Sequence, residues 1–370
     1  MECNFRRKHI FLGLDFGTTR SGAFAVHAWV CQEHRCFRVI EEAPVNKFPT
    51  KFIHSPENRI ELVGPDQDVP DKHVVKNAKL EILLSDPGWF EETGDFREIQ
   101  SWVKNGWQGA GDAGFAAEYF GIAIKKLYEL ALAAIDKSDA PKESITTVVT
   151  FPNLRDKAKD TLKIGLAYSN ILSRCRDVHV GVESQAALAG LLHRCPEVAQ
   201  MALAERESVI VADCGGITLD MAAFRHFDPA CGGTPTTGSI SVLGGGLWID
   251  RNFERLVDRK LSELMAQISE PDHEHAKGVK SSLMIQWHSF IKERPLHPQR
   301  VFLTGGLGCS KSVRELVQRI LDTKVEGNEP RMRVQDTEDT FGLWNAVAMG
   351  GAHYFDPTIS VACSSWKPFP

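Results

Sequence analysis

The fold of this chain is decided by Gly13-Leu14-Asp15-Phe16-Gly17-Thr18-Thr19-Arg20-Ser21-Gly22. An apolar stretch, Ile10–Asp15, leads into it and a second one, Gly22–Val30, leaves it, so the pattern predicts two strands joined by a tight turn. Backbone N–H groups and hydroxyls exposed by such a turn can hold phosphate oxygens. Asp15 adds a carboxylate of the kind that a phosphate-bound Mg²⁺ needs. Taken alone, the motif is explained equally well by an ordinary β-hairpin.

The same pattern recurs in the second half of the chain as Asp213-Cys214-Gly215-Gly216-Ile217-Thr218-Leu219-Asp220. The apolar stretch Ser208–Asp213 precedes the turn, and Ile217–Phe224 returns from it. Hairpin geometry brings the two terminal carboxylates of this motif close together, and close carboxylates repel unless a cation or a proton lies between them. The repetition predicts two similar halves that face each other.

A third motif, Val301-Phe302-Leu303-Thr304-Gly305-Gly306-Leu307-Gly308, runs from a strand toward a helix that begins at Lys311. Its glycines let a ligand approach the backbone closely. The segment Gly305–Ser312 also nearly matches a P-loop, in which Lys311 would grip phosphates, but Ser310 stands where that loop requires its second glycine. No acidic strand follows to complete a metal site, so the P-loop is the weaker interpretation.

Together and in this order, the three motifs resemble the actin-like ATPase superfamily, and within it the nucleotide-binding domain of the heat-shock protein 70 chaperones. The first two resemble its phosphate loops and the third its adenosine loop. The similarity runs from Ile10 to Tyr354 and is closest to divergent members without a substrate-binding domain. Four other segments also resemble the family: Val149–Asn153, Gly181–Ala187, Gly244–Asp250 and Ala346–Gly351.

The resemblance implies an α/β fold of the two-lobed actin-like (ribonuclease H-like) type, with mixed sheets flanked by helices and nucleotide in the cleft between the lobes. Residues 9–196 would form the first lobe, with phosphate loop 1 and the catalytic glutamate. Residues 207–355 would form the second, with phosphate loop 2, the adenosine loop and a shortened outer subdomain. Residues 356–370 would be a C-terminal tail.

The family's roles transfer to individual residues of this sequence. The implied catalytic residues are Glu183, Asp213 and a lysine, for which Lys79 is the first choice and Lys76 the second. Asp15 and Asp220 would hold Mg²⁺ through water. The implied nucleotide-binding residues are Asp15, Gly17, Thr18, Thr19, Gly215, Gly216, Thr218, Gly305, Gly306 and Gly308.

The sequence departs from the family pattern at a few positions. Leu307 and Cys309 replace polar residues expected near the adenosine, and Ile217 stands where the family has a third glycine. A β-branched residue is uncomfortable at positive φ. Either Ile217 is already extended in the returning strand, so that Gly215 and Gly216 still donate their N–H groups, or the loop has moved. We expect the first, because Thr218 keeps its spacing from the aspartates.

The resemblance implies an ATP- or ADP-binding protein with Mg²⁺ and slow hydrolysis of ATP to ADP and phosphate. Two alternatives remain open: a non-hydrolysing, nucleotide-sensing interaction module, and a sugar or acetate kinase of the same superfamily. A protein partner or co-chaperone fits the first two functions.

Composition and charge narrow the remaining classes of function and location. A formal net charge of −5 gives no basic footprint for nucleic acid. The N-terminal apolar run is too short for a signal peptide or a membrane span. Nine scattered cysteines without a CxxC pair predict free thiols in a reducing, cytoplasmic compartment. The charged run His273–His275 is interpreted as a solvated face rather than a metal site. A cluster of tryptophans is interpreted as part of the core or of an interface, and it consists of Trp89, Trp102 and Trp107.

Overall fold

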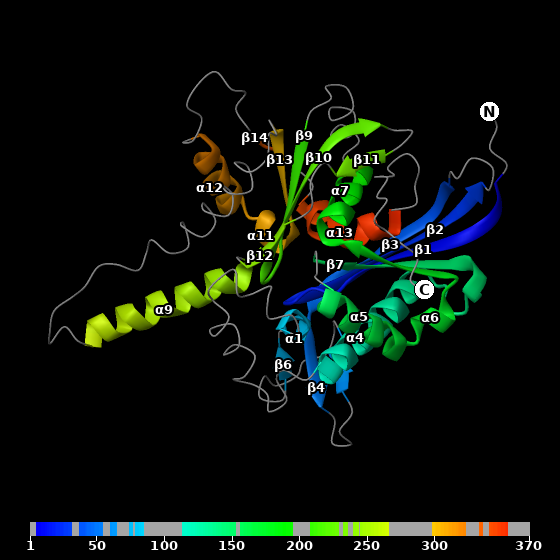
Figure 1. Ribbon diagram of the computed structural model, residues 1–370, viewed down its shortest axis with the longest axis horizontal. Helices are drawn as coiled ribbons and strands as arrows, with labels where there is room; N and C mark the ends of the chain where they lie inside the picture. The colour runs from blue at the N-terminus through cyan, green and yellow to red at the C-terminus, as the bar shows by residue number, and fades with distance from the viewer. Residues whose placement is uncertain are drawn as a thin grey trace.

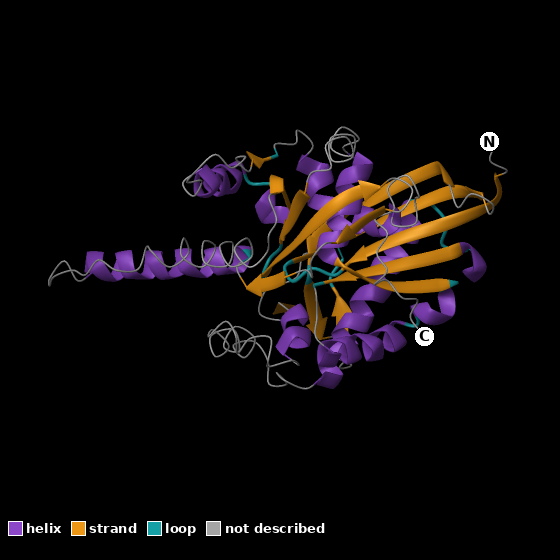
Figure 2. Cartoon of the chain, turned by 45° about the horizontal axis from the view of Figure 1, so that its top comes forward, coloured by secondary structure: helices purple, strands orange, loops and turns teal. Residues whose placement is uncertain are grey.

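The structure is a computed structural model of the 370-residue chain, and it describes fourteen segments of it. These are residues 5–31, 37–54, 60–64, 74–76, 78–84, 113–152, 156–194, 208–228, 232–235, 240–243, 245–265, 298–322, 333–335 and 340–353. Mixed sheets flanked by helices make it an α/β protein, as the sequence predicts (Figures 1 and 2). No helix within these segments is long and apolar enough to cross a membrane.

The first large sheet has the strand order β3-β2-β1-β7-β8. Its first three strands are antiparallel neighbours, whereas β7 and β8 run parallel to β1. Strand β7 is buried along its whole length, as expected of a β-branched central strand in a parallel pair. The strands are β1 (Phe5–Asp15), β2 (Arg20–Cys31), β3 (Phe37–Pro49), β7 (Ile145–Phe151) and β8 (Asp177–Val182).

Strand β3 is longer than the sequence suggests. The pattern predicts a strand over Cys36–Glu41, but pairing with β2 continues to Pro49, with Phe24 opposite Pro44. Proline lacks the N–H that a central strand needs, which argues against a strand there. Because β3 lies at the edge of its sheet, no further neighbour requires that N–H, and the prolines are accommodated.

The second large sheet repeats this arrangement in the order β11-β10-β9-β13-β14, with β12 also paired to β10. The hairpin β9–β10 corresponds to β1–β2, and β13 and β14 run parallel to β9. The two Asp–Gly motifs thus occupy the same position in two sheets of the same strand order. The strands are β9 (Ser208–Cys214), β10 (Thr218–Asp228), β11 (Gly232–Pro235), β12 (Ile240–Leu243), β13 (Pro298–Thr304) and β14 (Arg333–Val334).

Two helices, α7 (Glu183–Arg194) and α13 (Thr340–His353), pack side by side and connect the sheets (Figure 1). A buried apolar cluster joins Val148 of β7 and Val211 of β9 to alanines of both helices, including Ala187 and Ala346. Helix α13 also packs against β1 and β2. The last helix of the segment assigned to the second lobe therefore lies on the sheet of the first.

The remaining elements surround this frame. Helices α4 and α5 pack together, with α4 against the first sheet, and α12 lies beside β14 of the second. Helix α9 projects away from both sheets (Figures 1 and 2). A third, small sheet has the order β5-β4-β6. These elements are β4 (Lys51–His54), β5 (Ile60–Leu62), β6 (Val74–Lys76), α1 (Ala78–Leu84), α4 (Ala113–Ala134), η2 (Lys142–Ser144), α5 (Asp156–Ser169), α6 (Ile171–Arg174), α9 (Gly246–Met265), α11 (Gly305–Gly308) and α12 (Lys311–Asp322).

Some sequence interpretations fall outside the described residues. They concern the tryptophan cluster, the histidine-rich run and the tail, at Trp89, Trp102, Trp107, His273–His275 and 356–370. Within the described part, Cys31, Cys175, Cys214 and Cys309 form no disulfide bond.

Candidate functional site

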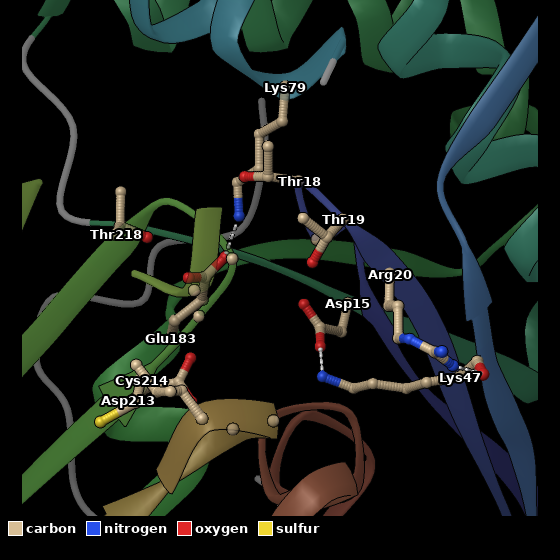
Figure 3. A pocket seen from close by; sticks show the side chains of 17 residues that line it. Asp15, Thr18, Thr19, Arg20, Lys47, Lys79, Glu183, Asp213, Cys214 and Thr218 are labelled. Carbon is tan, nitrogen blue, oxygen red and sulfur yellow. Dashed lines mark hydrogen bonds and ion pairs between the residues drawn. The ribbon is translucent and has the colours of Figure 1, made fainter. Parts of the chain in front are cut away.

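A cavity of about 320 Å³ lies where the turns of the two hairpins meet (Figure 3). Both large sheets contribute to its wall, together with residues from α1, α7, α9 and α11. Most of the residues singled out from the sequence line it: Asp15, Gly17, Thr18, Thr19, Lys79, Glu183, Asp213, Gly215, Gly216, Thr218, Gly305 and Gly306. The other lining residues are Arg20, Lys47, Cys214, Gly246 and Leu307.

The two turns approach each other closely at Gly216 and Thr19. A Cβ built on Gly216 would lie 2.5 Å from Thr19 Oγ1, so a larger residue would have to displace the Thr19 side chain. On the opposite side of the first turn, Thr50 hydrogen-bonds the backbone of the turn twice: its hydroxyl donates to Gly17 O at 2.9 Å and its N–H to Thr19 O at 2.9 Å. The first turn is therefore held by its carbonyl groups.

The second turn is held by the start of α9. The N–H groups of Gly245, Gly246 and Leu247 donate to the carbonyls of Ile217, Gly215 and Gly216 at 2.7–3.0 Å. Gly215 also donates its own N–H to Thr218 O at 2.9 Å, which closes the hairpin. In this structure the hairpin therefore uses the N–H of Gly215, and its contact with a phosphate stays a prediction.

Ile217 lies in the bend one residue before β10, rather than within the strand as expected. Its φ is not positive, since Asp136 and Asn170 are the non-glycine residues with positive φ in the described segments. Its side chain is 2% exposed and belongs to the hydrophobic cluster of the first sheet, against which Trp248 of α9 also packs. A β-branched residue fits here because its side chain enters the core and leaves the cavity open.

We therefore expect Ile217→Ala to lower the free energy of unfolding by about 2–3 kcal/mol, toward the lower end for a buried isoleucine because a turn can relax. ATP affinity should change by less than tenfold, since the side chain does not line the cavity. Chemical denaturation and calorimetry on the same preparation measure both. A gain in ATP affinity of tenfold or more would mean that Ile217 obstructs the phosphate position.

Lys79 and Glu183, which both line the cavity, form an ion pair. Lys79 reaches from α1 to Glu183 at the start of α7, with Nζ 2.5 Å from Oε1, and the two side chains are 3% and 4% exposed (Figure 3). Burial alone would lower the pKa of Lys79, but the carboxylates of Glu183 and Asp15 raise it, so the lysine stays charged. Burial also raises the pKa of Glu183 well above its ordinary value, against the attraction of Lys79.

A second ion pair involves a residue that the sequence did not single out. Lys47 Nζ lies 2.6 Å from Asp15 Oδ2 at the end of β1 (Figure 3). Although burial opposes it, the pKa of Lys47 is raised by Asp15 and Asp213. Lys47 stands in the part of β3 beyond the predicted strand, and no motif marks it. It lies where the β2–β3 register shifts, with its side chain beside Gly22 of β2, and this position brings it to the cavity.

The two aspartates of the second hairpin lie opposite each other, because Asp213 and Asp220 are register partners across β9 and β10. Asp213 faces the cavity and accepts a hydrogen bond from Thr304 Oγ1 at 3.0 Å. Burial raises the pKa of Asp213, and it raises that of Asp220 to about 6. Asp220 is buried and does not line the cavity, and it accepts a hydrogen bond from Ser241. Its other oxygen, Oδ2, is buried and makes no hydrogen bond within the described part of the chain.

The buried charges of this region do not balance. The four carboxylates and two ammonium groups belong to Asp15, Glu183, Asp213, Asp220, Lys47 and Lys79. If all were ionised, the carboxylates would leave an excess of two negative charges. Buried carboxylates of this kind either take up protons or hold a cation. The unsatisfied oxygen of Asp220 and the oxygen-rich donor set fit a hard divalent cation such as Mg²⁺.

The third motif forms a one-turn helix, α11, where the sequence suggests a simple turn. Gly305 has φ of 76°, and a Cβ on it would lie 2.6 Å from Asp213 Oδ1, so glycine is required there. Gly308 is not among the lining residues; it packs against Leu303 of β13. Lys311 is 87% exposed and pairs with Glu315 at 3.9 Å, so it does not grip a ligand as a P-loop lysine would.

Comparisons with known proteins do not assign this chain to a family. A scan against protein-family models found no match, and a search of curated protein sequences found none.

Proposed function

We propose that the protein binds ATP with Mg²⁺ in this cavity and hydrolyses it slowly, as a divergent actin-like ATPase that resembles the nucleotide-binding domain of heat-shock protein 70. One observation carries the proposal. Two hairpins in sheets of the same strand order each carry a buried aspartate beside the turn, and both turns line one cavity that contains a buried Lys–Glu pair. In such a two-lobed fold, nucleotide would lie between the lobes.

Phosphoryl transfer requires mainly positioning and neutralisation of charge. Thr18, Thr19 and Thr218 line the cavity, and their hydroxyls would bind phosphate oxygens. Asp15 and Asp220 would hold Mg²⁺ through water, and the bound ion would neutralise charge on the phosphates. Glu183 and Asp213 would orient the attacking water and accept its proton, a role that suits carboxylates with raised pKa values.

Lys47 adds a step of its own to this proposal. Its ammonium group neutralises Asp15 at 2.6 Å. Because Lys47 engages Asp15 Oδ2, a magnesium-bound water would compete with it for this carboxylate and favour its release. The released ammonium group can then meet a phosphate oxygen, because Lys47 lines the same cavity. Lys47 would thus exchange one negative partner for another when nucleotide binds.

A non-hydrolysing nucleotide sensor is the second candidate. Glu183 is engaged by Lys79 and Asp15 by Lys47, so two of the four carboxylates already have short ion-pair partners. If these pairs persist with nucleotide bound, the cavity would bind ATP without activating water. Phosphate release measured on protein that binds ATP distinguishes the two functions.

Calorimetry with Mg-ATP tests the proposal directly. We expect saturable binding that depends on Mg²⁺, and we expect Asp15→Asn or Asp220→Asn to weaken Mg-ATP binding by tenfold or more, which is about 1.4 kcal/mol. Asp160→Asn is the matched control, because its carboxylate is 68% exposed on α5 and pairs with Lys163 away from the cavity. Absence of both heat and a thermal shift with Mg-ATP would contradict the proposal.

A further inference from the structure

A second group of polar side chains lies apart from the cavity, at the ends of α7 and α13. Glu42 of β3, His193 of α7 and His353 of α13 each offer one ligand atom, and these atoms all lie within 4.8 Å of one another. Glu42 Oε2 is 3.3 Å from Nε2 of His193 and 3.3 Å from Nε2 of His353. None of the three lines the cavity.

The distances fit a tetrahedral metal ion. Zinc bonds imidazole nitrogen and carboxylate oxygen at roughly 2.0–2.2 Å, so two ligand atoms on a tetrahedron lie about 3.4 Å apart. Both contacts of Glu42 Oε2 have this length. Two imidazoles and one carboxylate form a ligand set that favours zinc and related transition metals over Mg²⁺ or Ca²⁺.

The imidazole rings must separate to hold one ion together. They are stacked with centroids 3.5 Å apart and an interplanar angle of 20°. Two imidazoles on one tetrahedral ion would place their centroids about 5 Å apart. His193 is 21% exposed in the last turn of its helix and would be the ring that moves, because His353 is fully buried against Phe24. Glu42 is 33% exposed, which leaves room for a water molecule as the fourth ligand.

We propose that Glu42, His193 and His353 form a binding site for a transition-metal dication such as Zn²⁺. The ion joins three segments that lie far apart in the sequence: the edge strand β3 and the C-terminal ends of α7 and α13. Because α7 and α13 connect the two large sheets, metal at this position fixes their ends to the first sheet. The site is independent of the proposed nucleotide cavity and is tested without nucleotide.

The test is calorimetric titration of the chelator-stripped full chain with Zn²⁺, together with the visible absorption of the Co²⁺ form. We expect one Zn²⁺ ion per chain and tetrahedral Co²⁺ bands. His193→Gln and Glu42→Gln should each weaken Zn²⁺ binding by about a hundredfold, because loss of a mere supporting contact already costs up to that much. Thermal melting of the metal-free variants verifies that they remain folded.

The double change His273→Ala/His275→Ala is the matched control, since this run places two histidines beside Glu274 in the sequence. It should leave Zn²⁺ binding unchanged. The proposal is overturned if the wild-type chain binds no Zn²⁺, if the control variant loses the binding, or if folded His193→Gln and Glu42→Gln both retain it. Should His193→Gln fail to fold, the partly exposed Glu42→Gln and its Co²⁺ spectrum decide the outcome.

Discussion

Phosphate release from ATP should fall by about 10²–10⁴-fold when Asp213 is changed to asparagine, the range for loss of a general base. Asparagine keeps the oxygen that accepts the Thr304 hydrogen bond, so the site should retain its shape. ATP affinity should therefore change little while turnover is lost. A single-turnover assay of phosphate release, paired with calorimetry on the same variant, measures the two quantities separately.

The pH dependence of phosphate release by the wild-type chain is a second test of Asp213 as the general base. Burial raises the pKa of Asp213, and only the ionised carboxylate accepts a proton from water. Turnover should increase as pH rises through that pKa, and the variant should lose this increase. Asp160→Asn, an exposed aspartate on α5, should behave as the wild type. Full phosphate release from Asp213→Asn would remove Asp213 from the mechanism.

The free energy of unfolding should fall by about 3–5 kcal/mol when Glu183 is changed to alanine, because the change leaves the Lys79 ammonium group buried without its partner. The pair is almost inaccessible to solvent, and its ions are 2.5 Å apart. Replacing both residues, as in Lys79→Met with Glu183→Leu, should recover most of the loss, since an apolar pair leaves no buried charge. Chemical denaturation of the single and double variants measures the coupling.

The chain offers a matched exposed pair for comparison. Lys163 and Asp160 lie 2.8 Å apart with side chains 55% and 68% exposed. Asp160→Ala should change stability by about 1 kcal/mol or less, as is usual for an exposed pair. Both ion pairs join a lysine to a carboxylate, and they differ in how deeply they are buried. Equal losses at both sites would mean that Lys79 and Glu183 are not buried together in solution.

Local sequence patterns predicted most of the regular elements. The patterns predict a strand over Ile145–Phe151 and helices over Arg155–Tyr168 and Ser184–His193. The strand agrees with β7 at both ends, and α5 and α7 differ from the predicted helices by one residue at each end. Apolar periodicity and β-branched runs act over a few residues, so they are readable without knowledge of the fold. The prolines of β3 obscured the strand, because the same residues read as a loop unless the strand is known to lie at an edge.

The repeated Asp–Gly motif also allowed most of the candidate site to be assembled in advance. A tight turn after a strand places its residues at one end of a sheet, so two such turns indicated the residues that line the cavity. Two contacts of the assigned glycines were not foreseen: the N–H of Gly215 is bound within its hairpin, and Gly308 packs against Leu303 outside the cavity lining. Such contacts depend on how the turn and its neighbouring strand are packed, and the spacing of residues in a motif does not specify that packing.

The sequence by itself therefore determined the two hairpins, their buried aspartates and the neighbouring strands and helices, because each depends on residues close together in the chain. Only the tertiary structure decided that Lys47 meets Asp15, that Ile217 enters the core, and that α13 returns to the first sheet. The same holds for Glu42, His193 and His353. These contacts join distant segments, and they depend on strand register and helix packing, which no local spacing of residues encodes.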